Sequence, residues 1–192
     1  DYGVVLRSSL ELARDGSLTD TAYFSRYPFQ VYPLLYMTFF MKLIHARTMA
    51  AACGVSYVLN IIHILVALYG AFFVGKLLHG KRFGLKILLF CMCSAPLFLY
   101  ASICYTDTLA LPFPVWTLAL WLYARKMPAL TKQQKWKKTA LYVGSGMMAG
   151  FGLRIKSIAA IGLIALMIFL LFDRTEQISE RKEGKNTPAF WQ

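Results

Sequence analysis

The sequence lacks the short motifs that mark the common soluble enzymes. It contains no glycine-rich nucleotide loop, no HExxH zinc pair and no nucleophile elbow. The sequence therefore gives no indication of a soluble enzyme that acts on nucleotide sugars. No internal repeat or low-complexity segment stands out either.

Cysteine is scarce, and its placement argues against a structural role for it in cross-linking. Cys53, Cys91, Cys93 and Cys104 lie inside or at the edges of apolar runs. Such positions favour buried free thiols over a disulfide framework. The Cys91-x-Cys93 pair has no second pair of ligands, so we predict no metal site at this pair.

Acidic residues are few, with nine Asp and Glu against 21 Lys and Arg and a formal net charge of +12. A strong positive charge suits nucleic acid in general. Here, however, the basic residues fall in short loops between apolar runs, which the positive-inside rule of membrane proteins explains better. We therefore expect no nucleic-acid partner.

Hydrophobic residues make up 58% of the chain, and the mean hydropathy is +0.52. Soluble domains are usually about 45–50% apolar, so the excess indicates membrane spans. The apolar runs are 29–45, 50–75, 87–104, 109–124, 140–153 and 157–172. The chain opens on Asp1 with no signal peptide ahead of it and stops in a polar stretch, and we expect both ends to be cuts.

The basic connectors predict the topology. Three of them, within 76–86, 125–138 and 174–185, are separated by two apolar runs each, so all three fit on the cytoplasmic side. The turns at 105–108 and 153–156 then lie outside. A single span over 140–172 is the alternative, but it would be about 50 Å long with Arg154 and Lys156 near its middle.

Residues 1–49 are predicted to form one outer loop with two interfacial helices. In 1–16, Leu6 and Leu10 begin an apolar stripe, and Gly16 suits a helix end. In 29–45, Pro33 suits a helix start, and a helix from there to Ala46 is about 21 Å long, too short to cross the bilayer. Thr38, Lys42 and His45 form a polar stripe on it, as expected of a helix in the interface. A true span with a snorkelling Lys42 is the alternative.

The expected fold is therefore an all-α, polytopic transmembrane helix bundle in the plasma membrane. Residues 1–49 form the outer loop, 50–172 form five spans, and 173–192 form a polar cytoplasmic connector. Within the spans, Gly146-x-x-x-Gly150 favours close helix packing, and Asn60 and His63 favour hydrogen bonds between helices over catalysis.

This topology brings five ionisable residues to the outer face: Asp1, Arg26, Asp107, Arg154 and Lys156. Charged groups near a membrane commonly mark a functional cavity. Basic groups suit a lipid phosphate, and a carboxylate suits a general base. Each residue taken alone also has a simpler explanation, as a solvated loop residue, a helix cap or a snorkelling side chain.

The order of these features resembles the GT-C membrane glycosyltransferases, closest to the family 39, protein-mannosyltransferase-like group that includes the aminoarabinose transferases of lipid A. The resemblance runs over nearly the whole chain. It begins with an Asp and an amphipathic helix ending in glycine, here Asp1 to Gly16. An aromatic pair, a basic residue and a proline follow, here within 23–28. The later matches are the basic turn 75–82, the outer Asp107, and a glycine-rich span closing on Lys156.

The resemblance implies inverting transfer of a sugar from a polyprenyl-phosphate donor to an acceptor on the extracytoplasmic face. Asp1 would be the general base, and Arg26 and Lys156 would hold the phosphate. Asp107 and Arg154 would line the cavity or position the acceptor. No cofactor is indicated, a divalent metal is left open, and membrane lipids are expected partners. A lipid-phosphate-binding transporter or flippase, or a non-catalytic membrane protein, is the alternative.

Overall fold

Every regular element in the described part of the chain is helical. The computed structural model describes residues 2–101, 106–164 and 166–168, so the predicted connector 173–192 lies outside the described residues. The elements are α1 (Tyr2–Arg14), α2 (Thr21–Arg26), the 3-10 helix η1 (Pro28–Gln30), α3 (Val31–Leu43), α4 (Met49–His79), α5 (Lys81–Met92), α6 (Ala95–Ala101), α7 (Thr106–Ala110), α8 (Pro112–Lys126), α9 (Lys132–Ile155) and the 3-10 helix η2 (Ser157–Ala159). The predicted all-α class is confirmed.

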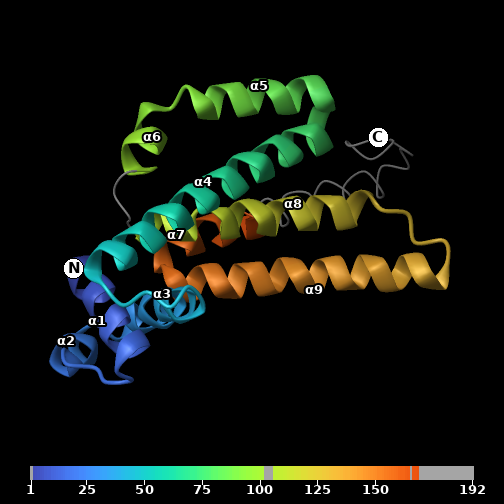
Figure 1. Ribbon diagram of the computed structural model, residues 1–192. Helices are drawn as coiled ribbons and strands as arrows, with labels where there is room; N and C mark the ends of the chain where they lie inside the picture. The colour runs from blue at the N-terminus through green and yellow to red at the C-terminus, as the bar shows by residue number, and fades with distance from the viewer. Residues whose placement is uncertain (1, 102–105, 165, 169–192) are drawn as a thin grey trace.

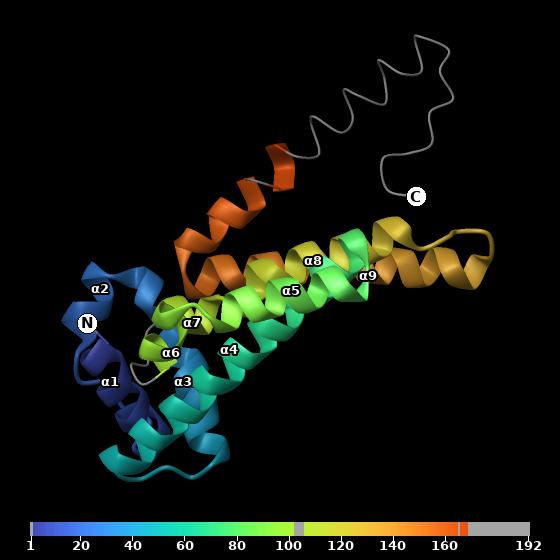
Figure 2. The same ribbon diagram turned by 90° about the horizontal axis from the view of Figure 1, so that it is seen from above.

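The helices form an elongated body with a cap at one end (Figure 1). Helix α4 packs against both α5 and α8, and α8 packs against α9. Helices α1, α2 and α3 gather where α4 begins and α9 ends, in both views of the ribbon (Figure 2). The α4–α5 and α8–α9 turns lie at the opposite end.

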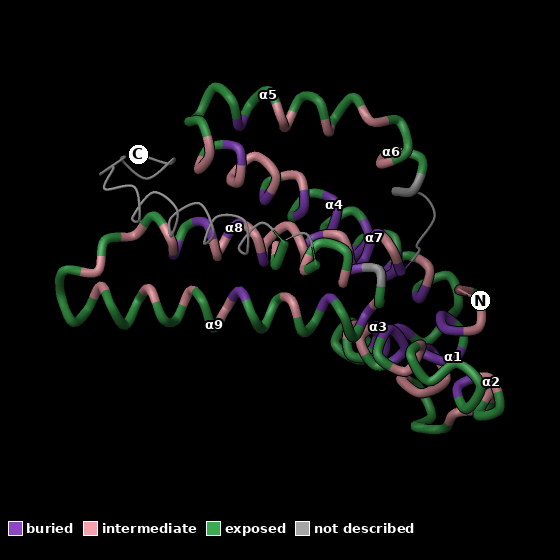
Figure 3. The backbone as a smooth tube through the Cα atoms, turned by 180° about the vertical axis from the view of Figure 1, so that it is seen from behind, coloured by how far each residue is buried: buried purple, intermediate pink, exposed green. Residues whose placement is uncertain are grey.

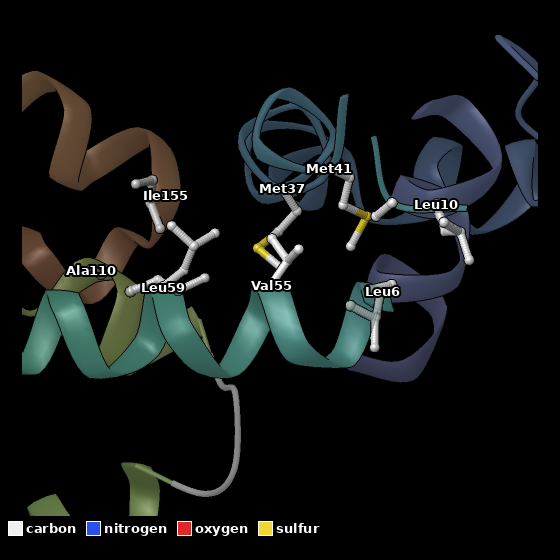
Figure 4. Packing of buried hydrophobic residues seen from close by; sticks show 11 residues of the cluster. Leu6, Leu10, Met37, Met41, Val55, Leu59, Ala110 and Ile155 are labelled. Carbon is white, nitrogen blue, oxygen red and sulfur yellow. The ribbon is translucent and has the colours of Figure 1, made fainter. Parts of the chain in front are cut away.

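The cap is held by an apolar cluster that joins α1, α3 and α4 (Figure 4). Leu6 and Leu10 of α1 meet Met37 and Met41 of α3 above the first turns of α4. On the other face of α1, Arg7 and Glu11 form an ion pair of 3.1 Å. The helix ends before Gly16, whose φ of +70° suits a residue without a Cβ. The predicted helix over 1–16 is confirmed.

Helix α3 lacks the polar stripe that was predicted for it. Thr38 is only 5% exposed, and its hydroxyl donates to the Leu34 carbonyl of its own helix at 2.8 Å. The same hydroxyl lies 3.4 Å from the Ser9 carbonyl of α1. His45 lies beyond the end of the helix. The predicted polar stripe of Thr38, Lys42 and His45 is therefore wrong, because the tight contact with α1 buries a hydroxyl that bonds to its own helix.

Helix α4 is the one described helix that is long and apolar enough to cross a bilayer. Its 31 residues rise about 46 Å. Tyr57, Ile61 and Leu65 form an exposed row on one face, whereas Leu59 and His63 are buried on another. Buried and exposed stretches alternate along the α4 tube (Figure 3). As predicted, His63 bonds between helices: its Nε2 lies 2.8 Å from the Tyr36 hydroxyl of α3.

Two of the predicted runs have different bounds in the structure. The run 87–104 is interrupted between α5 and α6, because Pro96 has no N–H to donate to the preceding turn. The run 140–153 belongs to a longer helix, α9, which starts at Lys132. Thr131 and Gln134 form a capping box there, each side chain bonding the other's backbone N–H, at 3.2 and 3.1 Å.

The two basic turns that the structure describes lie at the same end of the body, opposite the cap (Figure 1). The Lys126 ammonium at the end of α8 donates to the Leu77 carbonyl at the end of α4. Gly80 joins α4 to α5 with a φ of +86°. The first and second basic connectors therefore lie at the same end of the described body.

Close helix contact occurs at glycines other than the predicted pair. A Cβ on Gly84 of α5 would lie 2.6 Å from the Phe72 carbonyl oxygen of α4, and one on Gly75 would lie 2.9 Å from the Gly84 Cα. At Gly146 and Gly150, a Cβ would meet no described atom within 4 Å. The predicted packing role of Gly146-x-x-x-Gly150 finds no partner among the described residues, since this face of α9 points away from α8.

Candidate functional site

A pocket of about 200 Å³ opens where the start of α1, η1, α7 and the end of α9 meet. Its walls carry aromatic, amide, hydroxyl and ammonium groups. The lining residues are Tyr2, Phe29, Gln30, Thr106, Ile155, Lys156 and Ser157. The site therefore combines apolar surface with hydrogen-bonding groups, as small-molecule sites usually do.

An ion pair stands at the wall of this pocket. The Lys156 Nζ lies 2.6 Å from Asp107 Oδ2, and the two side chains are 27% and 39% exposed. Asp107 belongs to the first turn of α7. The structure thus brings together two of the five predicted site residues, which lie 49 positions apart in the sequence.

The end of α9 positions Lys156. The helix stops at Ile155, and Lys156 is extended, with φ −154° and ψ 129°. Its backbone N–H still donates to the Gly152 carbonyl at 2.9 Å. Gly152 permits this arrangement, because a Cβ there would lie 2.8 Å from the Phe113 Cβ of α8. The chain then turns into η2, so 140–172 does not form one straight helix over the described residues.

Gln30 supplies an acceptor that the described protein does not use. Its Oε1 is buried and has no hydrogen-bond partner among the described residues. Buried polar atoms are nearly always bonded in folded proteins, so this acceptor marks a place beside the pocket where a donor is missing. A donor group of a ligand would satisfy it.

The remaining predicted site residues do not line this pocket. The Arg154 guanidinium lies 4.8 Å from the centre of the Tyr32 ring and donates to the Tyr32 hydroxyl. The Arg26 guanidinium lies 5.8 Å from the centre of the Tyr27 ring. Asp1 lies outside the described residues, although Tyr2, which follows it, lines the pocket.

Sequence reasoning missed the neutral lining of the pocket. Phe29 and Gln30 directly follow the predicted aromatic, basic and proline segment 23–28, so their place in the chain was the available signal. Ser157 likewise follows Lys156. Within the described residues, no group of three or more His, Cys, Asp or Glu side chains could hold a metal ion.

One protein family matches residues 4–188, and it is described as a conserved hypothetical integral membrane protein. The match includes α3 to α9 entire, and with them Asp107, Lys156 and most of the pocket lining. Neither a curated protein nor a solved structure matches the chain.

Proposed function

The chain belongs to the family of conserved hypothetical integral membrane proteins, and from this premise we propose that it is part of a GT-C-like membrane glycosyltransferase. The donor is a polyprenyl-phosphate sugar, and transfer occurs on the extracytoplasmic face. The proposal includes a multi-pass topology in which the α4–α5 and α8–α9 turns face the cytoplasm. The pocket at the other end then lies at the outer surface of the membrane.

The observation that carries the proposal is the Asp107–Lys156 ion pair at the wall of the pocket. An ammonium has three N–H donors, and Asp107 accepts one of them at 2.6 Å. This contact fixes the direction of the ammonium before any ligand arrives. The cation can then bind a phosphate oxygen with little reorganisation, which is the basis of electrostatic stabilisation in active sites.

Two other groups support a sugar as the second part of the ligand. The buried Gln30 Oε1 needs a donor, which a sugar hydroxyl supplies. Phe29 is exposed at the same pocket and offers an apolar surface for the face of a sugar ring or for the start of a lipid chain. We assign the phosphate to Lys156 rather than to Arg26, because the Arg26 guanidinium lies over Tyr27 and outside the pocket lining.

The proposed reaction is a single displacement. The Asp1 carboxylate takes the proton of the acceptor hydroxyl, whose oxygen attacks the anomeric carbon. The bond between that carbon and the phosphate oxygen breaks, and its electron pair leaves on polyprenyl phosphate. Configuration at the carbon inverts. Lys156 stabilises the negative charge that grows on the departing phosphate, and Asp107 positions Lys156.

The test uses the full-length protein and a radiolabelled polyprenyl-phosphate sugar. Lys156→Gln should lower transfer about 10²–10³-fold, the range observed when one charge-stabilising donor is removed. Lys156→Arg should restore part of the rate, because the cation is kept. Lys137→Gln, which removes an exposed lysine from the other end of α9, is the matched control and should transfer at the normal rate.

Asp1→Asn separates the transferase from the alternatives. A general base contributes about 10²–10⁴-fold, so transfer should fall by that factor while donor binding persists. Undiminished transfer in Asp1→Asn would refute the assignment of the base. Movement of the labelled lipid across the membrane by a protein that transfers no sugar would instead identify a flippase.

A further inference from the structure

A second and larger pocket lies at the opposite end of α1 from the candidate active site. Its volume is about 550 Å³, and it sits between the ends of α1 and α3 and the connector to α4. The residues that line it are Ala13, Arg14, Asp15, Met41, Lys42, His45, Ala46 and Arg47. The 13 residues of α1 put about 20 Å between the two pockets.

The charges in this pocket are unbalanced. Arg14, Lys42 and Arg47 contribute three positive charges and Asp15 one negative charge, which leaves +2 before His45 is considered. Arg14 and Asp15 satisfy each other in an ion pair of 2.6 Å. The side chains of Lys42, His45 and Arg47 form no hydrogen bond or ion pair with the described part of the chain. Two permanent cations are therefore available to an anion.

The backbone holds these side chains in place through the end of α3. The Ala46 N–H donates to the Met41 carbonyl at 2.9 Å, and the His45 N–H donates to the Lys42 carbonyl at 3.1 Å. These two bonds form a Schellman motif, with His45 at the left-handed position, φ +55°. The motif reverses the chain after Lys42, so Arg47 lines the same pocket.

The pocket borders exposed apolar surface at the start of the membrane-spanning helix. Leu43 and Ile44 are 64% and 58% exposed, and Met49, the first residue of α4, is exposed as well. Basic side chains next to exposed apolar ones are typical of a protein surface at the lipid headgroup level. The volume falls within the range of about 300–1,000 Å³ that small-molecule sites occupy, more than a bare anion requires.

We propose that this pocket binds the phosphate of an anionic membrane lipid. The Arg47 guanidinium offers paired N–H donors that match two phosphate oxygens, and Lys42 adds a point charge. The acyl chains lie along Leu43 and Ile44. The site is independent of the proposed transferase reaction, so it can exist whether or not that reaction does.

The experiment measures binding of short-chain phosphatidylglycerol to the full-length protein in neutral detergent, by native mass spectrometry. Phosphatidylcholine and inorganic phosphate serve as the two comparison ligands. We expect phosphatidylglycerol to bind at least tenfold more tightly than either. Lys42→Gln/Arg47→Gln should weaken that binding tenfold or more, because both charge-assisted contacts are lost.

Two further variants make the result decisive. Lys135→Gln/Lys137→Gln removes the same charge from exposed positions on α9 and should change the affinity less than twofold. Lys42→Arg/Arg47→Lys keeps both charges and should retain most of the binding, which excludes a simple folding defect. Equal affinity for both lipids, or equal loss in the α9 variant, would overturn the proposal. If inorganic phosphate binds as tightly as the lipid, and this binding is also lost in Lys42→Gln/Arg47→Gln, the ligand is free phosphate and the proposal of a lipid is wrong.

Discussion

The close contact between α4 and α5 predicts that adding one carbon atom, the Cβ of an alanine at position 84, destabilises the protein. Gly84→Ala would place a Cβ 2.6 Å from the Phe72 carbonyl oxygen and 3.0 Å from the Lys76 nitrogen. Ordinary contacts begin near 3.4 Å, so the overlap with the oxygen is 3.4 minus 2.6, or 0.8 Å. Both atoms belong to the backbone of α4 and cannot rotate away. The helices must therefore separate.

The size of the effect follows from two opposing contributions. Replacing glycine by alanine inside a helix stabilises it by about 0.5–1 kcal/mol. Overpacking a close contact costs about 1–3 kcal/mol. Gly150→Ala in α9 is the matched control, because no described atom lies within 4 Å of its Cβ and only the favourable contribution remains. Gly84→Ala should thus be less stable than Gly150→Ala by about 1–3 kcal/mol.

Unfolding titrations with SDS in mixed micelles measure this difference on the full-length protein. The two sites lie on helices that do not pack closely together, so the double variant should equal the sum of the single ones within about 0.5 kcal/mol. If Gly84→Ala stabilises the protein as much as Gly150→Ala does, α4 and α5 do not cross at this point. The close contact of Gly84 with the backbone of α4 would then be wrong.

Three other substitutions test local features. Thr131→Ala should cost about 0.5–2 kcal/mol by removing the hydroxyl that caps α9, and faster amide exchange in the first turn, at Gln134, checks it. Ser145→Ala removes the buried hydroxyl that donates to the Thr117 carbonyl of α8 at 2.8 Å, so SDS unfolding should show a loss of about 0.5–1.5 kcal/mol. His45→Gly relieves a left-handed backbone and should raise stability in the same assay by about 1 kcal/mol. A loss of stability would contradict the left-handed conformation of His45.

Sequence periodicity predicted the helices better than it predicted their ends. The apolar stripe of 1–16 and the long run 50–75 correspond to α1 and α4, because both signals come from burial over many residues. The sequence did not predict the start of α9, because the charge of Lys132 and its neighbours indicated a connector between spans. Lysine is a good helix former, and charge indicates the side of a membrane rather than the backbone conformation.

The sequence predicted the charged pair of the candidate site, but it did not predict the uncharged residues that line the pocket. Asp107 and Lys156 could be assigned to one face by counting spans, whereas the only signal for Gln30 was its place directly after the segment 23–28. The sequence likewise did not indicate that Arg154 would contact Tyr32. Whether an arginine points into a pocket or stacks on Tyr32 depends on the positions of α3 and α9, which composition does not specify.

The bond from Lys126 to the Leu77 carbonyl has a consequence for how such a chain enters a membrane. It joins the turns of two helical hairpins at one end, where most of the described lysines and arginines between α4 and α9 also lie. In the proposed topology, the basic turn of each hairpin stays on the side of the membrane on which the chain is synthesised. No basic turn then has to be carried through hydrocarbon, a transfer that costs about 2.5–3.5 kcal/mol per charged residue at the bilayer centre. We expect the two hairpins to insert as successive units, each complete once its second helix has been made.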